Sequence, residues 1–380
     1  MGKEKFISEL YNESFVESSA MRATLAEMEE DSQWIRTETK QIVVSPVENF
    51  PIMATDIAKE LGCDAEALQD TMMRGTCLAI KFNGMIYPVR GTAIKSMLDR
   101  AGVHGDTISM FNPDEMSQLF GLCYPKVKGY SSVLIRGRKA TAVMSDNGGG
   151  YKYLSMLDLM SSTEKMLNER FGDKAEFING WVSHDFMIAR YAINEPKLLE
   201  AYETLTQDSP YGANFTPQLV IYTSDIGTCS AKIVPSFMTS RGATIRICDD
   251  LYVKHRKSAT LAEFEEKLNE TFAKYVDFAT CLGKMAEVVI PEPCKAFMLA
   301  AKKAGVSIRL AKKALNDFQM YVGDGEATAH DIYLGLCEVL FYAKAEGKDE
   351  KALCSVEETV SRCLAFDWAN WKSWENEEKK

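Results

Sequence analysis

The stretch QLVIYTSDIGTCSAKIVPSFMTSRGATIRICDDLYVKHRK, residues 218–257, decides the fold class of this chain. It holds three runs of β-branched and aromatic residues, at 219–223, 230–237 and 244–248. The turn formers Asp225-Ile226-Gly227 and Ser240-Arg241-Gly242 separate these runs, so the stretch predicts three strands of an antiparallel meander. A fourth short run, 251–255, follows. Strands this apolar need cover on at least one face, which predicts helices packed against the sheet.

Earlier residues add further hairpins to this strand-rich region, which we place at 71–259. Asn83-Gly84 separates two short apolar runs and tolerates the positive φ angles of a type I′ turn. Pro88 follows in the second run and cannot donate a ladder hydrogen bond, so its strand is expected at an edge. Gly137-Arg138 predicts a second hairpin. Asn179-Gly180, between two apolar pairs, predicts a third.

Helical spacing dominates both ends of the chain. Residues 1–70 form an acidic segment in which Met21, Leu25 and Met28 share one helical stripe, typical of a surface helix or of an arm that orders on a partner. After Thr260, which with Glu263 makes a capping box, residues 260–380 show successive helical patterns. The sequence therefore predicts an α+β protein. Its strand-rich core lies between an N-terminal helical segment and a helical C-terminal third.

Composition limits the classes of function. With 380 residues, 46% hydrophobic and 26% charged, the chain is typical of a globular protein. No apolar run approaches the roughly 20 residues of a membrane span, and the N-terminus lacks the apolar block of a signal peptide, so we expect a cytoplasmic protein. The ten cysteines form no Cys-x-x-Cys pair and the four histidines have no ligand-like spacing. The sequence therefore predicts neither a cofactor nor a resident metal.

Basic residues cluster beside aromatic ones, although the net charge is −10. Phosphates need cations along a groove and unstacked bases need aromatic faces, so these clusters are candidates for contacts to single-stranded nucleic acid. The candidate residues are Lys126, Lys128, Arg136, Arg138, Lys139, Tyr151, Lys254, His255, Arg256 and Lys257. Tyr151 also follows three consecutive glycines, 148–150, whose N–H groups can turn toward an anion. A solvated charged surface and a flexible hairpin exit are the plainer alternatives.

A metal site is a further alternative. Asp225, Asp249 and Asp250 carry carboxylates that could hold Mg²⁺ in a nuclease, because hard cations prefer several such oxygens. The same aspartates are also ordinary turn residues, and this second interpretation is favoured.

Several motifs resemble a known family. The segment Tyr222-Thr223-Ser224-Asp225-Ile226-Gly227, then Ser230-Ala231, Gly242 and Val253-Lys254-His255-Arg256, is similar to a pattern in the phage and plasmid proteins of the domain of unknown function 932 family. That family has Asn and Glu where Thr223 and Asp225 stand here, and its Cys-x-Asn-Gly element is reduced to Arg241-Gly242. Segments 136–151 and 328–342 resemble two other family elements. The resemblance implies an origin on a phage or mobile element and a cytoplasmic setting, and carries over no catalytic residue.

Three hypotheses follow from these observations. The leading one is a DNA-metabolism protein of a phage or mobile element that binds single-stranded nucleic acid, in an oligomer that helps strands anneal. The second is an acidic inhibitor that binds a host defence or replication protein, suggested by the charge of −10. The third is the metal-dependent nuclease. A binding protein is favoured over an enzyme, and no membrane partner is expected.

Overall fold

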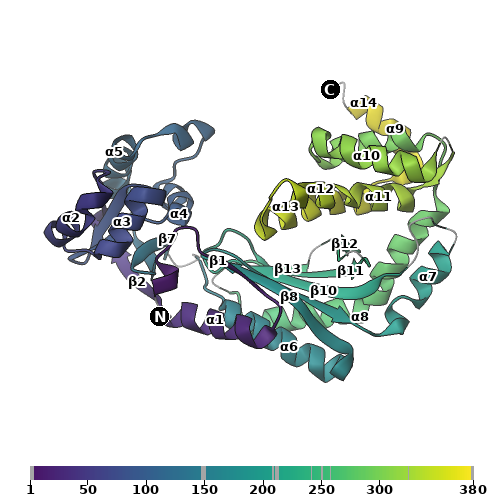
Figure 1. Ribbon diagram of the computed structural model, residues 1–380, viewed down its shortest axis with the longest axis horizontal. Coiled ribbons are helices and arrows are strands. Elements are labelled where there is room, and N and C mark those ends of the chain that lie inside the picture. The colour runs from purple at the N-terminus through teal and green to yellow at the C-terminus, as the bar shows by residue number, and fades with distance from the viewer. Residues whose placement is uncertain are drawn as a thin grey trace.

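The computed structural model shows a large central sheet, with a smaller N-terminal unit at one end and helices over both of its faces (Figure 1). The structure describes residues 4–146, 151–207, 209, 214–240, 242–249, 251–256, 258–323 and 325–377. Within these ranges, no helix combines the length and the apolar character that crossing a membrane requires. The mixture of antiparallel sheets and a helical C-terminal region confirms the predicted α+β class.

The large sheet contains the predicted meander. Its strands run in the order β1 (Asn12–Phe15), β8 (Ala175–Ser183), β9 (Met187–Ile193), β10 (Thr216–Thr223), β11 (Ala231–Met238) and β12 (Thr244–Arg246). Each neighbouring pair is antiparallel, and Val220 lies opposite Val234 on β11 and Arg190 on β9. The short β13 (Leu251–Val253) pairs with the other end of β11, so β12 and β13 share one edge of the sheet.

The hairpin predicted at Asn179-Gly180 is wrong. Strand β8 continues through these residues with a register shift between Phe177 and Asn179, and Gly180 pairs with Ala189 on β9. The chain turns later, where the Ser183 N–H donates to the Phe186 carbonyl at 2.8 Å. A Cβ on Gly180 would lie 2.2 Å from the Met21 sulfur, so this glycine admits a helix and does not make a turn.

Helices cover both faces of the large sheet. The helices α1 (Ser18–Glu30), α6 (Met156–Phe171) and α8 (Leu261–Lys284) pack on one face and share its main hydrophobic core. Met21, Leu25 and Met28 are buried in that core, so α1 belongs to the folded protein. The predicted cap of α8 is present, because the Thr260 hydroxyl accepts from the Glu263 N–H at 3.1 Å.

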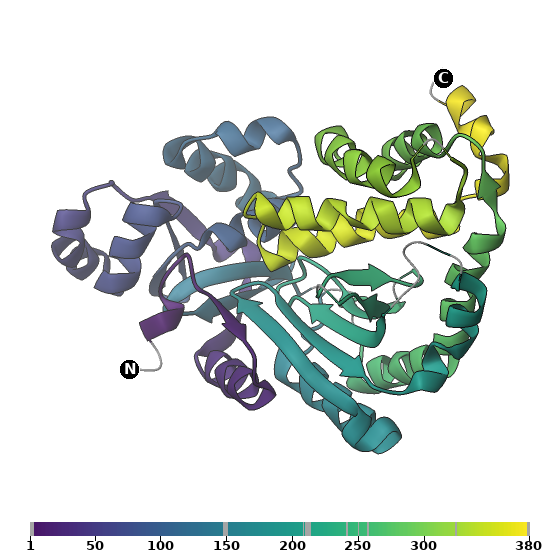
Figure 2. The ribbon, with the colours of Figure 1, turned by 45° about the vertical axis from the view of Figure 1, so that its right-hand side comes forward.

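The C-terminal helices lie across the other face of the sheet (Figure 2). They are α9 (Pro293–Ala304), α10 (Ile308–Val322), α11 (Ala329–Cys337), α12 (Val339–Ala345), α13 (Glu350–Ser361) and α14 (Trp374–Glu377). Two short strands, β14 (Val289–Ile290) and β15 (Ala327–Thr328), pair with each other, and helix α7 (Glu200–Thr206) packs against α8. Trp368, Trp371 and Trp374 are buried, so the tryptophan-rich end docks on the core.

Two small antiparallel sheets form the N-terminal unit. One contains β2 (Ser32–Glu38), β6 (Tyr130–Arg136) and β7 (Lys139–Ser145), and the other β3 (Val43–Pro46), β4 (Leu78–Phe82) and β5 (Met85–Pro88). Around them lie α2 (Ala54–Leu61), α3 (Ala65–Arg74), α4 (Gly91–Ala101) and α5 (Pro113–Cys123). Residues 1–70 thus supply strands to three sheets.

Local turn chemistry explains the two hairpins of this unit. Asn83 and Gly84 have φ of 49° and 77°, as a type I′ turn requires, and Gly137 and Arg138 have 57° and 59°. Both predicted hairpins are confirmed. Strand β5, which contains Pro88, is at the edge of its sheet as expected.

Candidate functional site

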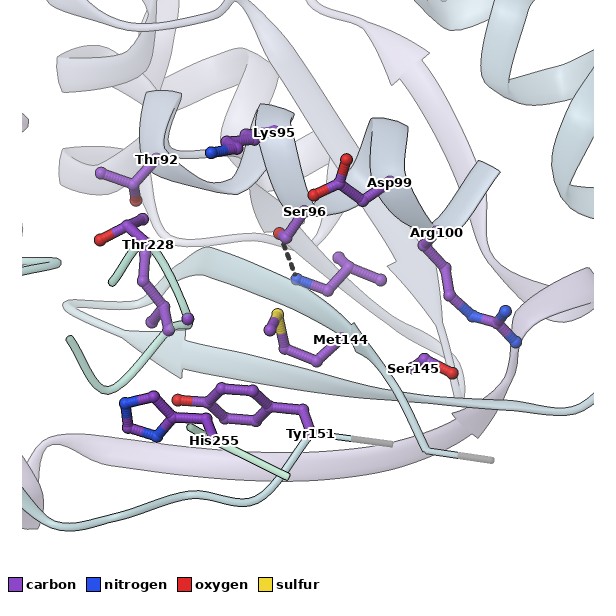
Figure 3. A pocket seen from close by; sticks show the side chains of 13 residues that line it. Thr92, Lys95, Ser96, Asp99, Arg100, Met144, Ser145, Tyr151, Thr228 and His255 are labelled. Carbon is purple, nitrogen blue, oxygen red and sulfur yellow. Dashed lines mark hydrogen bonds between the residues drawn. The ribbon is translucent and has the colours of Figure 1, made fainter. Parts of the chain in front are cut away.

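A cavity of about 410 Å³ lies where the N-terminal unit meets the large sheet (Figure 3). Its volume falls in the range of ligand pockets, about 300–1,000 Å³. It is lined by Thr92, Lys95, Ser96, Asp99, Arg100, Val143, Met144, Ser145, Tyr151, Ile226, Gly227, Thr228 and His255. These residues come from four segments that are far apart in the sequence.

Helix α4 forms one wall of this cavity. Thr92, Lys95, Ser96 and Asp99 recur at helical spacing and therefore share the face that meets the cavity (Figure 3). The helix is tied to β7, because the Thr92 hydroxyl donates to the Thr141 carbonyl and the Ser96 hydroxyl accepts from the Val143 N–H at 2.9 Å. Lys95 is exposed and forms no ion pair with any residue that the structure describes. Its ammonium is free to meet an anion.

An aromatic pair forms the opposite wall. The rings of Tyr151 and His255 stack with their centroids 5.3 Å apart and their planes 20° from parallel. A short antiparallel bridge joins Tyr151 to Arg256, and the Lys152 N–H donates to the His255 carbonyl at 3.3 Å. The Tyr151 hydroxyl donates to the backbone carbonyl of Asp225. These backbone contacts between the two segments, together with the bond to Asp225, hold both rings in place.

The protonation of these two rings follows from burial. Burial raises the pKa of Tyr151 well above its ordinary value and lowers the pKa of His255. The His255 Nδ1 lies 3.2 Å from the Lys152 carbonyl, which only accepts, so Nδ1 carries the proton of the neutral ring. At neutral pH this wall is an uncharged aromatic surface, suited to stacking.

The turn after β10 supplies the base of the cavity. Gly227 has φ of 75°, and a Cβ there would lie 2.9 Å from the Met144 methyl and 3.1 Å from the Tyr151 ring. Only glycine satisfies both the backbone angle and this close approach. Ile226 packs with Leu134 and Ala142 of the small sheet, so this turn joins the two parts of the molecule.

The structure places two of the predicted nucleic-acid contacts, Arg136 and Lys139, inside the protein. Arg136 is 1% exposed, pairs with the carboxylate of Asp225 and donates to the His184 carbonyl at 2.6 Å. Lys139 is fully buried between Glu9 and Asp70. Both cations are neutralised inside the protein, where a phosphate cannot reach them. Arg138, between them, is half-exposed and pairs with Asp64 of the α3 cap at 2.9 Å.

Other predicted residues do lie at or beside the cavity. Tyr151 and His255 line it, and Lys254 and Arg256 flank His255 with exposed side chains. Lys126 and Lys128 are exposed. The Lys128 carbonyl accepts from the guanidinium of Arg100, which lines the cavity, at 3.0 Å. Lys257 and the glycines 148–150 lie outside the described residues.

Sequence reasoning missed the helix α4 wall. The run 92–101 has helical spacing with one apolar face, and its opposite face carries Lys95, Ser96 and Asp99. The polar residues at helical spacing were the available signal, but such a face is typical of any solvated helix. Only the fold shows that this face and Tyr151 line the same cavity.

The three aspartates do not form a described metal site. No group of three or more His, Cys, Asp or Glu side chains in the described ranges is placed to hold a metal ion. Asp225 is 2% exposed and paired with Arg136, whereas Asp249 lines a separate cavity beside α8. Asp250 lies outside the described residues.

Comparisons with protein family models, with curated proteins and with solved structures find no match to this chain. The resemblance to the domain of unknown function 932 family therefore stays a prediction.

Proposed function

We propose that this protein binds single-stranded nucleic acid, with one nucleotide in the cavity between α4 and the Tyr151–His255 pair. The observation that carries this proposal is the juxtaposition of a stacked, uncharged aromatic wall with Lys95, a cation that forms no ion pair among the described residues. In this arrangement an unstacked base stacks on the aromatic wall, and a phosphate binds the ammonium of Lys95. Each base stacked on a protein ring contributes about 1–3 kcal/mol.

Exposed cations around the cavity extend this contact along a strand. Lys128 lies on the side of Arg100, and Lys254 and Arg256 lie on the side of His255. The whole chain has a net charge of −10, which opposes unspecific coating of nucleic acid. Lys95 in the cavity, with exposed cations in the neighbouring segments, instead supports a defined footprint.

Binding can be tested by fluorescence anisotropy of a labelled single-stranded oligonucleotide over a salt series. The double variant Lys254→Glu/Arg256→Glu changes two exposed side chains, so the fold is preserved. We expect at least about tenfold weaker binding, and a slope of log K against log salt that is shallower by roughly 1.4, since each phosphate contact contributes about 0.7.

A matched control carries the same change of charge at a distance. Lys312 on α10 and Lys348 after α12 are exposed and do not line the cavity. The variant Lys312→Glu/Lys348→Glu should retain the affinity and the salt slope of the natural protein. Equal losses in both double variants, or no binding by the natural protein at low salt, would contradict the proposal.

The biological role and the oligomeric state are part of the same proposal. A DNA-metabolism role on a phage or mobile element, in an oligomer that helps strands anneal, rests on the family resemblance and on the single-strand contact. Light scattering with and without a long single strand tests it. A defined oligomer that accelerates annealing of complementary strands supports the role, whereas a monomer without annealing activity contradicts it.

One observation favours the second candidate, a protein partner. Phe50, Ile52 and Met53, just before α2, are apolar and exposed, and Ile52 is 100% exposed. Exposed apolar residues that gather together mark interaction surfaces. Affinity capture from nuclease-treated host extract, compared between the natural protein and Ile52→Ser, tests it. A specific host protein lost in the variant supports this candidate, and capture unaffected by the substitution contradicts it.

A further inference from the structure

A second cavity, of about 320 Å³, lies next to the aromatic wall of the first. It is lined by Lys152, Tyr153, Leu154, Ser155, Asp158, Leu159, Ala259, Thr260 and Leu261. We call it the leucine cavity, and the first one the α4 cavity. Nothing in the proposed function so far uses it.

The two cavities follow one another along the same pair of chain segments. Tyr151 and His255 line the α4 cavity, and later residues of each segment, 152–155 with 158–159 and then 259–261, line the leucine cavity. The segments are joined by the bridge from Tyr151 to Arg256 and by two contacts between the backbone and ring of His255 and the backbone of Lys152. A ligand that occupied both cavities would cross this bridge.

Aromatic rings stand at both cavities at a spacing that suits a nucleic-acid strand. Trp34 contacts the rings of Tyr151 and Tyr153, with centroid distances of 6.0 Å and 6.2 Å. The α-carbons of two residues this close in sequence are at most about 7 Å apart. This upper limit on the backbone spacing is about two steps of 3.4 Å, the rise per nucleotide of a stacked strand, so neighbouring nucleotides of one strand can reach both residues.

The residues that line the leucine cavity determine which part of a nucleotide can bind there. Leu154, Leu159 and Ala259 are buried, and the Tyr153 ring is fixed because its hydroxyl donates to Glu29 at 3.0 Å. These groups suit an uncharged base, and the exposed carboxylate of Asp158 disfavours a phosphate there. Lys152 is exposed at the junction of the two cavities, where the linking phosphate would pass.

We infer that the two cavities bind successive parts of one single strand, with bases in the α4 and leucine cavities and the phosphate between them at Lys152. This inference rests on the proposed function and adds a second subsite to it. The ligand that fills both cavities is therefore longer than a mononucleotide. Affinity is expected to rise steeply when a strand first becomes long enough to reach both cavities.

Calorimetric titration with thymidine monophosphate and with thymidine oligonucleotides of two, four and eight units tests this inference. We expect the affinity to rise by about tenfold or more between the mononucleotide and the tetranucleotide, as expected for one additional stacked base. The variant Lys152→Glu should weaken the tetranucleotide more than the mononucleotide and so reduce that rise, because only the longer ligand places a linking phosphate at the junction. Lys165→Glu, at an exposed position of α6 outside both cavities, is the control.

The outcomes separate the inference from the proposed function. If oligonucleotides bind but Lys152→Glu does not weaken the tetranucleotide, or weakens the mononucleotide equally, the second subsite is wrong and the first stands. If affinity does not increase with length, the second subsite is likewise wrong. If no ligand of any length binds the natural protein, the proposed function itself fails.

Discussion

At the scale of single residues, the buried pair of Arg136 and Asp225 links the two parts of the molecule. Arg136 ends β6 of the small sheet and Asp225 follows β10 of the large sheet. Asp225 also accepts the Tyr151 hydroxyl through its backbone carbonyl, so the aromatic wall and the junction depend on one turn. A buried charge that loses its partner is strongly destabilising.

Removing this arginine should destabilise the fold. We expect Arg136→Met to lower the free energy of unfolding by about 3–5 kcal/mol in urea denaturation, because Asp225 is left buried without its cation. The neighbouring Arg138→Met is the control, since Arg138 is half-exposed and its ion pair contributes at most about 1 kcal/mol. Equal effects of the two substitutions would show that the Arg136 pair has no special role.

His184 carries a second prediction at this scale. Its Nε2 lies 2.7 Å from the Ser8 carbonyl and therefore bears the proton, while Nδ1 is buried with no partner among the described residues. Burial and the nearby Arg90 hold the pKa of His184 well below its ordinary value. A proton added below pH about 6.5 therefore binds only the unfolded chain, and this residue weakens stability as the pH falls through that value.

Nitrogen NMR shifts of the histidine ring measure this directly, with His184→Gln to assign the signal. We expect His184 to stay neutral, with the proton on Nε2, between pH 7.5 and 5.5. A protonation midpoint near about 6.5 would show that the ring is solvated and that the buried arrangement is wrong.

At the scale of elements, short-range chemistry in the sequence predicts most strands and helices. Asn83-Gly84 and Gly137-Arg138 specify their hairpins because the turn angles are a local property of these residues. Asn179-Gly180 shows the limit of such reasoning. The same dipeptide lies inside β8, where Gly180 makes room for the Met21 side chain of α1. A contact across more than 150 residues cannot be seen in a short window.

This explanation of Gly180 predicts a clear stability effect. Gly180→Ala places a Cβ against the buried Met21 sulfur and should lower the free energy of unfolding by about 1–3 kcal/mol in urea denaturation. In the background of Met21→Ala the same substitution should cost less, because the two sites are coupled. Gly121→Ala in α5, where nothing lies within 4 Å of the new Cβ, is the control and should be neutral or stabilising. Loss of stability only at Gly121 would contradict this account.

At the scale of the whole molecule, the candidate site is a product of tertiary structure. The sequence identifies Tyr151 and His255 as candidates, because aromatic and basic residues cluster there. It does not separate exposed Arg256 from buried Arg136, since both lie in strand-rich basic segments. Burial of Arg136 and Lys139 is decided by the packing of residues 6–9 and of the large sheet against one hairpin. The same packing brings α4 to the aromatic wall.

The central claim is that a single strand lies on the Tyr151–His255 wall. Photocrosslinking of an oligonucleotide about eight units long that carries 5-iodouracil, followed by mass spectrometry of the peptides, tests it most directly. We predict crosslinks in peptides that contain Tyr151, Tyr153 or His255, and their loss when unlabelled strand competes. Crosslinks confined to the helices α9–α14, or none at saturating oligonucleotide, would contradict the claim.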